Sequence, residues 1–289
     1  MTFANTLQSN QDISAALPRS KGRVEISFEH DGATSCLKHL YQSGCGRVRF
    51  PLVEEHHCPE AVLINTSGGL TGGDVMSFDV TLHENTELTV SGQAAEKIYK
   101  SIGPMVKIEA RLDVQDGAYL EWLPQETILF DQARLQRVNK VALTKNSRLL
   151  AVEATILGRL AHGEVVREAS LVDGWEIMRD GKMIWFDRFR FEGNMHDVLG
   201  RSALMDGATS FATLVVAAPD ADQFLKIARA AEQNVTSRMG STALEDDLVI
   251  IRLLDKEPQS LRKNLVYIIQ QLREKMHGSA LSMPAAWEV

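Results

Sequence analysis

The sequence is poor in the features that mark several large classes of protein. It has only three cysteines, Cys36, Cys45 and Cys58, an odd number without a CxxC pair. This pattern argues against a disulfide scaffold and favours a reducing cytoplasm. No apolar run approaches the ~20 residues that span a bilayer, so we expect no membrane segment. A net charge of −7 lacks the clustered Lys and Arg of duplex binding, so nucleic acid is not an expected partner.

A targeting signal is also missing from the first residues. The stretch Met1–Ser20 has neither a basic n-region nor an apolar h-region, unlike a secretory signal. We expect residues 1–21 to form a flexible N-terminal arm. Residues 22–289 are expected to form a single domain, because a chain of 289 residues can build one large core.

Motifs for catalysis are absent too. Neither GxSxG nor HExxH occurs, and the cysteines have no activating context in the sequence. His162 is a lone histidine in an expected loop, which is more often structural or solvated than catalytic. We therefore predict no catalytic residue and no enzyme.

Alternation of apolar and polar residues dominates the remaining chain. Period-two runs such as 76–82 and 106–114 indicate strands, and the nearly apolar run 149–157 indicates a strand covered on both faces. Asp173-Gly174 and Asp180-Gly181 lie between β-rich runs, which is a strong hairpin signal. The sequence predicts a mainly β domain.

Only two segments, both late in the chain, predict good helices. In the first, Asp220 and Gln223 have the spacing of a capping box. The second begins near Gln259 and is stopped by Gly278. Its apolar stripe is expected to dock on the body, although docking on a partner stays open. The stripe contains Leu261, Leu265, Ile268, Leu272 and Met276.

A loop with four glycines, Gly68, Gly69, Gly72 and Gly73, ends at Asp74. A phosphate-binding loop opens a helix, whereas this loop leads into a period-two strand. Asp74 would also repel a phosphate. We predict a strand-to-strand turn in which glycine supplies positive φ and close backbone approach.

The polar loop from Glu54 to Pro59 contains His56, His57 and Cys58, which could hold nickel or zinc. Adjacent histidines on an extended chain point in opposite directions, however, so a solvated loop is favoured.

Several acids lie in expected strands whose same-face neighbours are apolar. Glu96, Glu121 and Glu153 are the examples. An ionised carboxylate on an interior face costs several kcal/mol unless it is paired, hydrated or metal-bound. These acids therefore mark either an edge or ion-pair position, or a polar, hydrated cavity inside the β-rich body.

Four long stretches resemble the urease accessory protein UreD family, called UreH in some organisms. They are NTSGGLTGGD (65–74), SGQAAEKIYKS (91–101), GAYLEWLPQETILFDQARL (117–135) and EATILGRLAHGE (153–164). Their order and spacing also match, and the likeness extends from about Gly22 to the late helices. The resemblance implies a largely β fold with solenoid-like stacking of strands and two helices.

The resemblance further implies a cytoplasmic maturation factor without turnover chemistry or a tightly bound cofactor. Members bind UreF directly and the GTPase UreG through UreF, and the assembly docks on apo-urease. GTP hydrolysis is linked to nickel release into the urease active site, and the family member is thought to offer an internal nickel route.

A nickel route would give the embedded acids a purpose, because sparse carboxylates attract an ion yet release it. We hypothesise that Glu96, Glu121 and Glu153, with Asp74 and Asp131 near loop mouths, line or gate such a route. Two other readings stay open, a carbohydrate-active enzyme on a β-solenoid and a structural β-protein. Only 6% aromatic residues disfavours long sugar-stacking grooves.

Overall fold

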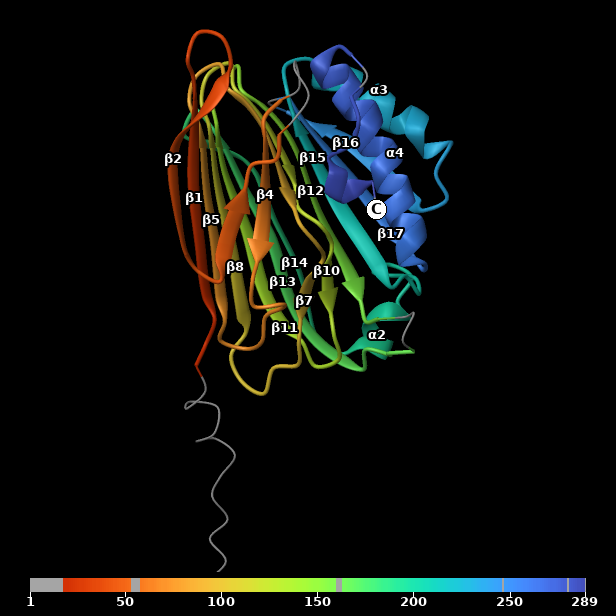
Figure 1. Ribbon diagram of the computed structural model, residues 1–289. Helices are drawn as coiled ribbons and strands as arrows, with labels where there is room; N and C mark the ends of the chain where they lie inside the picture. Colours follow the sequence, from red (N-terminus) through yellow and green to blue (C-terminus); the bar gives the residue numbers. More distant parts are fainter. Residues whose placement is uncertain (1–17, 53–57, 160–162, 246, 280, 289) are drawn as a thin grey trace, which may run out of the picture.

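Two β-sheets packed face to face form the body of the protein (Figure 1). The computed structural model describes residues 18–52, 58–159, 163–245, 247–279 and 281–288. The chain passes repeatedly from one sheet to the other, so successive strands of a sheet stack in parallel, as in a solenoid. The predicted mainly β, solenoid-like fold is confirmed.

The first sheet has seven strands, with antiparallel pairs only at its two ends. In spatial order they are β14 (Lys182–Asn194), β13 (Glu168–Arg179), β11 (Arg134–Leu143), β8 (Val106–Val114), β5 (Val75–Leu82), β1 (Lys21–His30) and β2 (Ser35–Gly44).

The second sheet has ten strands. Its main path is β16 (Arg238–Leu244), β17 (Leu248–Asp255), β15 (Ser210–Ala217), β12 (Arg148–Leu157), β9 (Tyr119–Leu123), β6 (Glu87–Gly92), β4 (Glu60–Asn65) and β3 (Gly46–Arg49). Two short strands branch from it, because β10 (Thr127–Leu129) pairs with both β12 and β7 (Glu96–Ile98).

Apolar side chains fill the space between the sheets in two clusters. One contains Trp175 of the first sheet and Leu120 of the second. The other contains Leu135 and Leu157, again from opposite sheets. Burial of each large aliphatic side chain contributes about 1.5–3 kcal/mol, so these clusters hold the sheets together.

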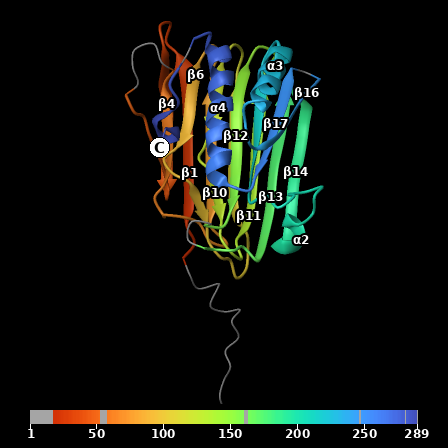
Figure 2. The same cartoon turned by 90° about the vertical axis from the view of Figure 1, so that its right-hand side faces the viewer.

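Two long helices, α3 (Ala221–Glu232) and α4 (Pro258–His277), cover the outer face of the ten-stranded sheet (Figure 2). The predicted stripe of α4 is buried against strands such as β12 and β17, which confirms intramolecular docking. Gly278 ends α4 with φ +73°, as predicted. The prediction of a capping box at the start of α3 was wrong. Asp220 has φ +68°, and its side chain makes no capping bond.

Three further features differ from the sequence prediction. A third short helix, α2 (Met195–Leu199), follows β14, and a 3-10 turn (Ala285–Trp287) lies near the end. The prediction of a hairpin turn at Asp173-Gly174 was wrong, because both residues lie within the continuous strand β13. A Cβ on Gly174 would lie 2.1 Å from Arg188 Nη1, so this glycine makes room for an arginine. The hairpin at Asp180-Gly181 is confirmed.

The glycine-rich loop joins β4 to β5, two strands of different sheets, as a turn. Gly69 has φ +143°, and a Cβ there would lie 2.4 Å from the Tyr99 ring. At Gly72 a Cβ would lie 1.9 Å from Ser101 Oγ. Both predicted uses of glycine, positive φ and close approach, are therefore confirmed.

Some predictions fall outside the described residues. They concern the arm up to residue 17, His56, His57 and His162. Cys36, Cys45 and Cys58 are described and are free thiols. Among the described residues, no helix has the length and apolarity needed to cross a membrane.

Candidate functional site

A cavity of about 180 Å³ lies between the sheets and is bounded by residues of both apolar clusters, such as Trp122 and Met76. Its remaining wall is unusually polar for a protein interior. Glu96, Arg137 and Glu153 line it, together with amide and hydroxyl side chains.

Strand register explains why these polar groups meet. Glu96 on β7 pairs with Thr127 on β10, and Thr127 pairs with Thr155 on β12. In the facing sheet, Arg137 on β11 pairs with Asp173 on β13. These register pairs place one polar layer across the space between the two sheets.

Arg137 is the centre of this layer, with its side chain only 3% exposed. Its Nε and Nη2 donate to the Asp173 carboxylate at 2.9 and 2.7 Å, and Nη1 lies 2.5 Å from Glu153 Oε2. It also donates to the hydroxyls of Thr127 and Thr155. Burial disfavours its charge, but Asp173 and Glu153 outweigh burial and raise its pKa. Burial also raises the pKa of Glu153, which the charge of Arg137 only partly offsets.

Glu96 has a different environment, because its hydrogen-bond partners are neutral. Asn65 Nδ2 donates to both carboxylate oxygens, at 3.0 and 3.1 Å, and the backbone N–H of Lys97 donates at 3.2 Å. The Lys97 residue itself is exposed. Burial raises the pKa of Glu96 to about 7, and these hydrogen bonds only partly oppose it. This carboxyl therefore changes charge near neutral pH.

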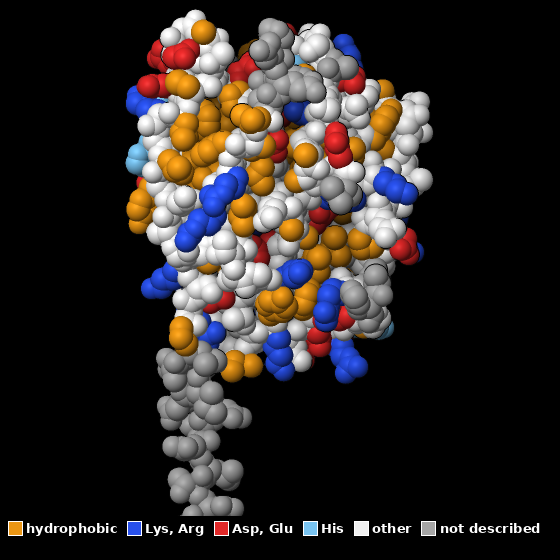
Figure 3. All heavy atoms as spheres, in the orientation of Figure 1, with side chains coloured by type: hydrophobic (Ala, Val, Ile, Leu, Met, Phe, Trp, Pro, Cys, Tyr) orange, Lys and Arg blue, Asp and Glu red, His pale blue; other side chains and the backbone are white. Residues whose placement is uncertain are grey.

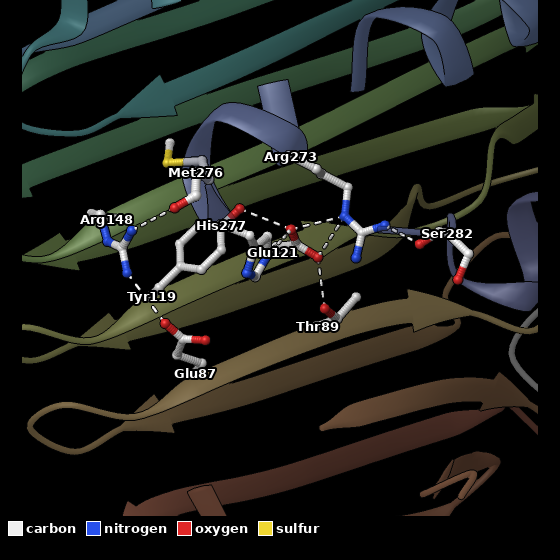
Figure 4. Close-up of polar contacts among 9 residues, drawn as sticks. All are labelled: Glu87, Thr89, Tyr119, Glu121, Arg148, Arg273, Met276, His277 and Ser282. Atoms are coloured by element: carbon white, nitrogen blue, oxygen red, sulfur yellow. Dashed lines mark hydrogen bonds and ion pairs between the residues drawn. The ribbon is translucent and has the colours of Figure 1, made fainter. Parts of the chain in front are cut away.

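Glu121 lies on the face of the ten-stranded sheet that points away from the cavity, under α4 (Figure 4). It is fully buried and binds Arg273 Nε at 2.9 and 3.0 Å and His277 Nε2 at 3.1 Å. The hydroxyls of Thr89 and Tyr119 also donate to it. Burial alone would raise its pKa, but the contacts with His277, Arg273 and Thr89 lower it to about 2. Glu121 therefore anchors α4 to the sheet as an ion pair.

The two loop acids are bound by backbone N–H groups. Asp74, 4% exposed, accepts from Ser20 N at 2.7 Å and Thr71 N at 2.8 Å, which ties the start of β1 to the glycine-rich loop. Asp131 accepts from the backbone N–H of Arg167 and Glu168 at 2.7 and 3.1 Å. Burial would raise the pKa of Asp131, but these donors lower it.

The structure thus brings together two of the five predicted acids, Glu96 and Glu153, in one cavity. Asp74, Glu121 and Asp131 do not line that cavity. Among the described residues, no group of three or more His, Cys, Asp or Glu side chains is placed to hold a metal ion.

Sequence reasoning missed the cationic partners, Arg137 and Arg273. Arg273 lies on the face of α4 that the apolar stripe marks as buried, since Ile269, Leu272 and Met276 are its neighbours there. Arg137 lies on the same face of β11 as the buried apolar residues Leu135 and Val141, which was the available signal. Neither position reveals which acid it pairs with.

The four stretches that resemble the UreD family all reach the cavity. They contribute Asn65, Glu96, Thr127 and Glu153 to its wall.

Comparisons with known proteins agree with this resemblance over nearly the whole chain. A family model described as UreD urease accessory protein matches residues 20–288. The chain is 40% identical over 255 residues to the urease accessory protein UreD of Xanthobacter autotrophicus, covering 88% of this chain and 87% of that protein. It is 36% identical over 274 residues to UreD of Magnetococcus marinus, covering 93% and 94%. Against UreD of Chelativorans sp. the identity is 36% over 286 residues, covering 98% and 99%. The chain therefore belongs to the UreD family of urease accessory proteins.

Proposed function

We propose that this protein is a non-enzymatic urease maturation factor that assists GTP-dependent nickel insertion into apo-urease. It binds UreF directly and the GTPase UreG through UreF, and the assembly docks on apo-urease in the cytoplasm. Nickel is the cargo, and the protein keeps no tightly bound cofactor.

One observation carries the proposal. The cavity between the sheets is lined from all four stretches by which the sequence resembles the family. Carboxylates in a cavity between two sheets destabilise the fold unless each ionised group is hydrated or paired. Transit of a divalent cation is a use of the cavity that matches its chemistry.

The five predicted acids then have two kinds of role. Glu96 and Glu153 face the cargo inside the cavity, where the hydrogen-bond partners of Glu96 are neutral. Asp74 and Asp131 hold loops in place and Glu121 anchors α4, through the backbone and ion-pair contacts described above.

Exposed apolar side chains support the dependence on partners. Hydrophobic atoms gather on the face that carries β4 (Figure 3). On the edge strand β2, Leu37, Leu40 and Tyr41 are 41%, 41% and 46% exposed. Large apolar patches on a protein surface often mark interaction sites.

The direct test is co-expression of apo-urease with the other accessory proteins, with and without this chain. Bound nickel per urease and ureolysis are measured after purification. We expect both to fall strongly when the chain is omitted and to return when it is supplied. Equal nickel loading in its absence would refute the proposed function.

A further inference from the structure

A second pocket, of about 300 Å³, lies on the outer face of the ten-stranded sheet, between β4, β6 and the segment that follows α4. We call it the outer pocket. Glu60, Thr89, Arg273 and residues 281–285 belong to its described lining. It shares no described lining residue with the cavity between the sheets. Its volume is at the lower end of the range for small-molecule sites.

Strand register places three polar side chains in a row on this outer face. Thr89 of β6 pairs with Glu60 of β4 on one side and with Glu121 of β9 on the other. Paired residues of parallel strands point to the same face, and neighbouring strands lie about 4.8 Å apart. Glu60 and Glu121 are therefore about 10 Å apart along the row. The outer pocket is lined by Glu60 and Thr89 but not by Glu121, so it lies over the Glu60 half of the row.

The two carboxylates of the row differ in their counter-ions. Glu121 is paired with Arg273 Nε at 2.9 Å. Glu60 makes no ion pair with any described residue, and Ser91 Oγ donates to its Oε1 at 2.7 Å. Glu288 also lines the pocket and likewise makes no ion pair with a described residue. The outer pocket therefore presents negative charge that a cationic hydrogen-bond donor would neutralise.

Arg273 adds a hydrogen-bond donor on the α4 side of the pocket. The residue is 5% exposed. Its Nε binds Glu121, and its Nη1 donates to the Ser282 carbonyl oxygen (Figure 4). Its Nη2 donates to no described residue, and Arg273 lines the pocket. An N–H of a buried guanidinium destabilises the fold unless an acceptor reaches it, and a ligand oxygen is such an acceptor.

We propose that the outer pocket binds a primary ammonium group together with the carbonyl or carboxylate oxygen next to it, as in an α-amino acid or the first residue of a peptide. The ammonium donates to Glu60 and Glu288, and the oxygen accepts from Arg273 Nη2. The row spacing of about 10 Å leaves room for one such group between these side chains. Leu281 and Met283 in the lining favour an aliphatic side chain on the ligand.

The test is isothermal titration calorimetry of the full-length chain with the tripeptide Leu-Gly-Gly, free L-leucine and N-acetyl-L-leucinamide. We expect binding of the first two, and binding at least about tenfold weaker for the acetylated compound, which lacks the ammonium. Tighter binding of the tripeptide assigns the site to peptide N-termini, and tighter binding of leucine assigns it to free amino acids.

A matched pair of variants tests the role of Glu60. Glu60→Gln should weaken binding of the tighter ligand by about tenfold or more, because the ammonium loses its counter-ion. Glu84→Gln, at an exposed turn, should bind like wild type. Thermal unfolding of each variant checks that it is folded.

Cys58 lines the outer pocket and reports its occupancy independently. Alkylation of Cys58 by iodoacetamide, followed by mass spectrometry, should slow when the tighter ligand is present. Cys36, a free thiol that does not line the pocket, should react at an unchanged rate.

Three outcomes overturn the inference. They are no binding of either ammonium ligand, equal binding of the acetylated compound, or full affinity in the folded Glu60→Gln variant. Each leaves nickel loading of urease untouched, so this inference and the proposed function fail separately.

Discussion

The ion-pair cluster under α4 allows a quantitative prediction about stability. In Glu121→Gln the side chain keeps its shape but loses its charge, and Arg273 is left buried without a counter-ion. The pKa of Glu121 falls from 4.5 to about 2 on folding. That difference stabilises the folded state by about 3 kcal/mol at neutral pH. Loss of one partner of a buried pair costs about 3–5 kcal/mol in other proteins, which agrees.

The sign of the pH dependence follows from the lowered pKa. The carboxylate contributes its full stabilisation above pH 4.5, and the contribution is lost as the pH falls toward 2. The free-energy gap between wild type and Glu121→Gln should therefore shrink from about 3 kcal/mol at pH 7 to about 2 kcal/mol at pH 3.5.

Thermal and urea unfolding, followed by circular dichroism, measure both quantities. A loss of about 3 kcal/mol lowers the unfolding temperature of a domain this size by about 6–12 °C. Glu84→Gln, at an exposed turn, is the matched control and should stay within about 0.5 kcal/mol of wild type. A Glu121→Gln chain as stable as the control, or a gap that does not change with pH, would contradict an ion-pair role.

Three further predictions concern other parts of the fold. Glu96→Gln should raise the unfolding temperature at pH 8 but not at pH 4, because burial of the ionised carboxylate lowers the free energy of unfolding by about 1–3 kcal/mol. An equal effect at both pH values would refute the raised pKa of Glu96. Gly72→Ala should destabilise the chain by about 1–3 kcal/mol, since its methyl group meets Ser101 Oγ, whereas Gly240→Ala meets open space and should be nearly neutral in urea unfolding. Leu265→Ala removes a fully buried side chain of α4 that packs against the ten-stranded sheet, and should cost about 2–5 kcal/mol in the same assay. A change below about 1 kcal/mol would mean that α4 is not docked.

Local sequence signals predicted strands and helices correctly where the pattern of neighbouring residues alone determines the structure. Period-two alternation identified β5 and β8, and the stripe with Gly278 identified α4 and its end. The same rules failed where a distant contact decided the outcome. Asp173-Gly174 has hairpin chemistry, but Arg137 binds the aspartate and Arg188 occupies the space over the glycine.

The candidate site was predictable only in part, for a related reason. The apolar neighbours of Glu121 and Glu153 left two positions open for these acids, an edge or ion-pair position and a hydrated cavity, and the structure places both acids in buried ion pairs. Alternation could not show that Glu121 faces α4 while Glu153 faces the other sheet, since both faces of these strands are buried. The pairing of Glu153 with Arg137 depends on packing between two sheets, which no local pattern encodes.

The central claim is that cavity acids of this UreD family member serve nickel delivery to urease. It is tested most directly by the nickel content of urease co-expressed with the other accessory proteins and the Glu96→Leu/Glu153→Leu double variant. We predict a clear loss of bound nickel, with normal loading by Glu84→Leu and normal co-purification of both variants with UreF. Full nickel loading of urease by the folded double variant would contradict the claim.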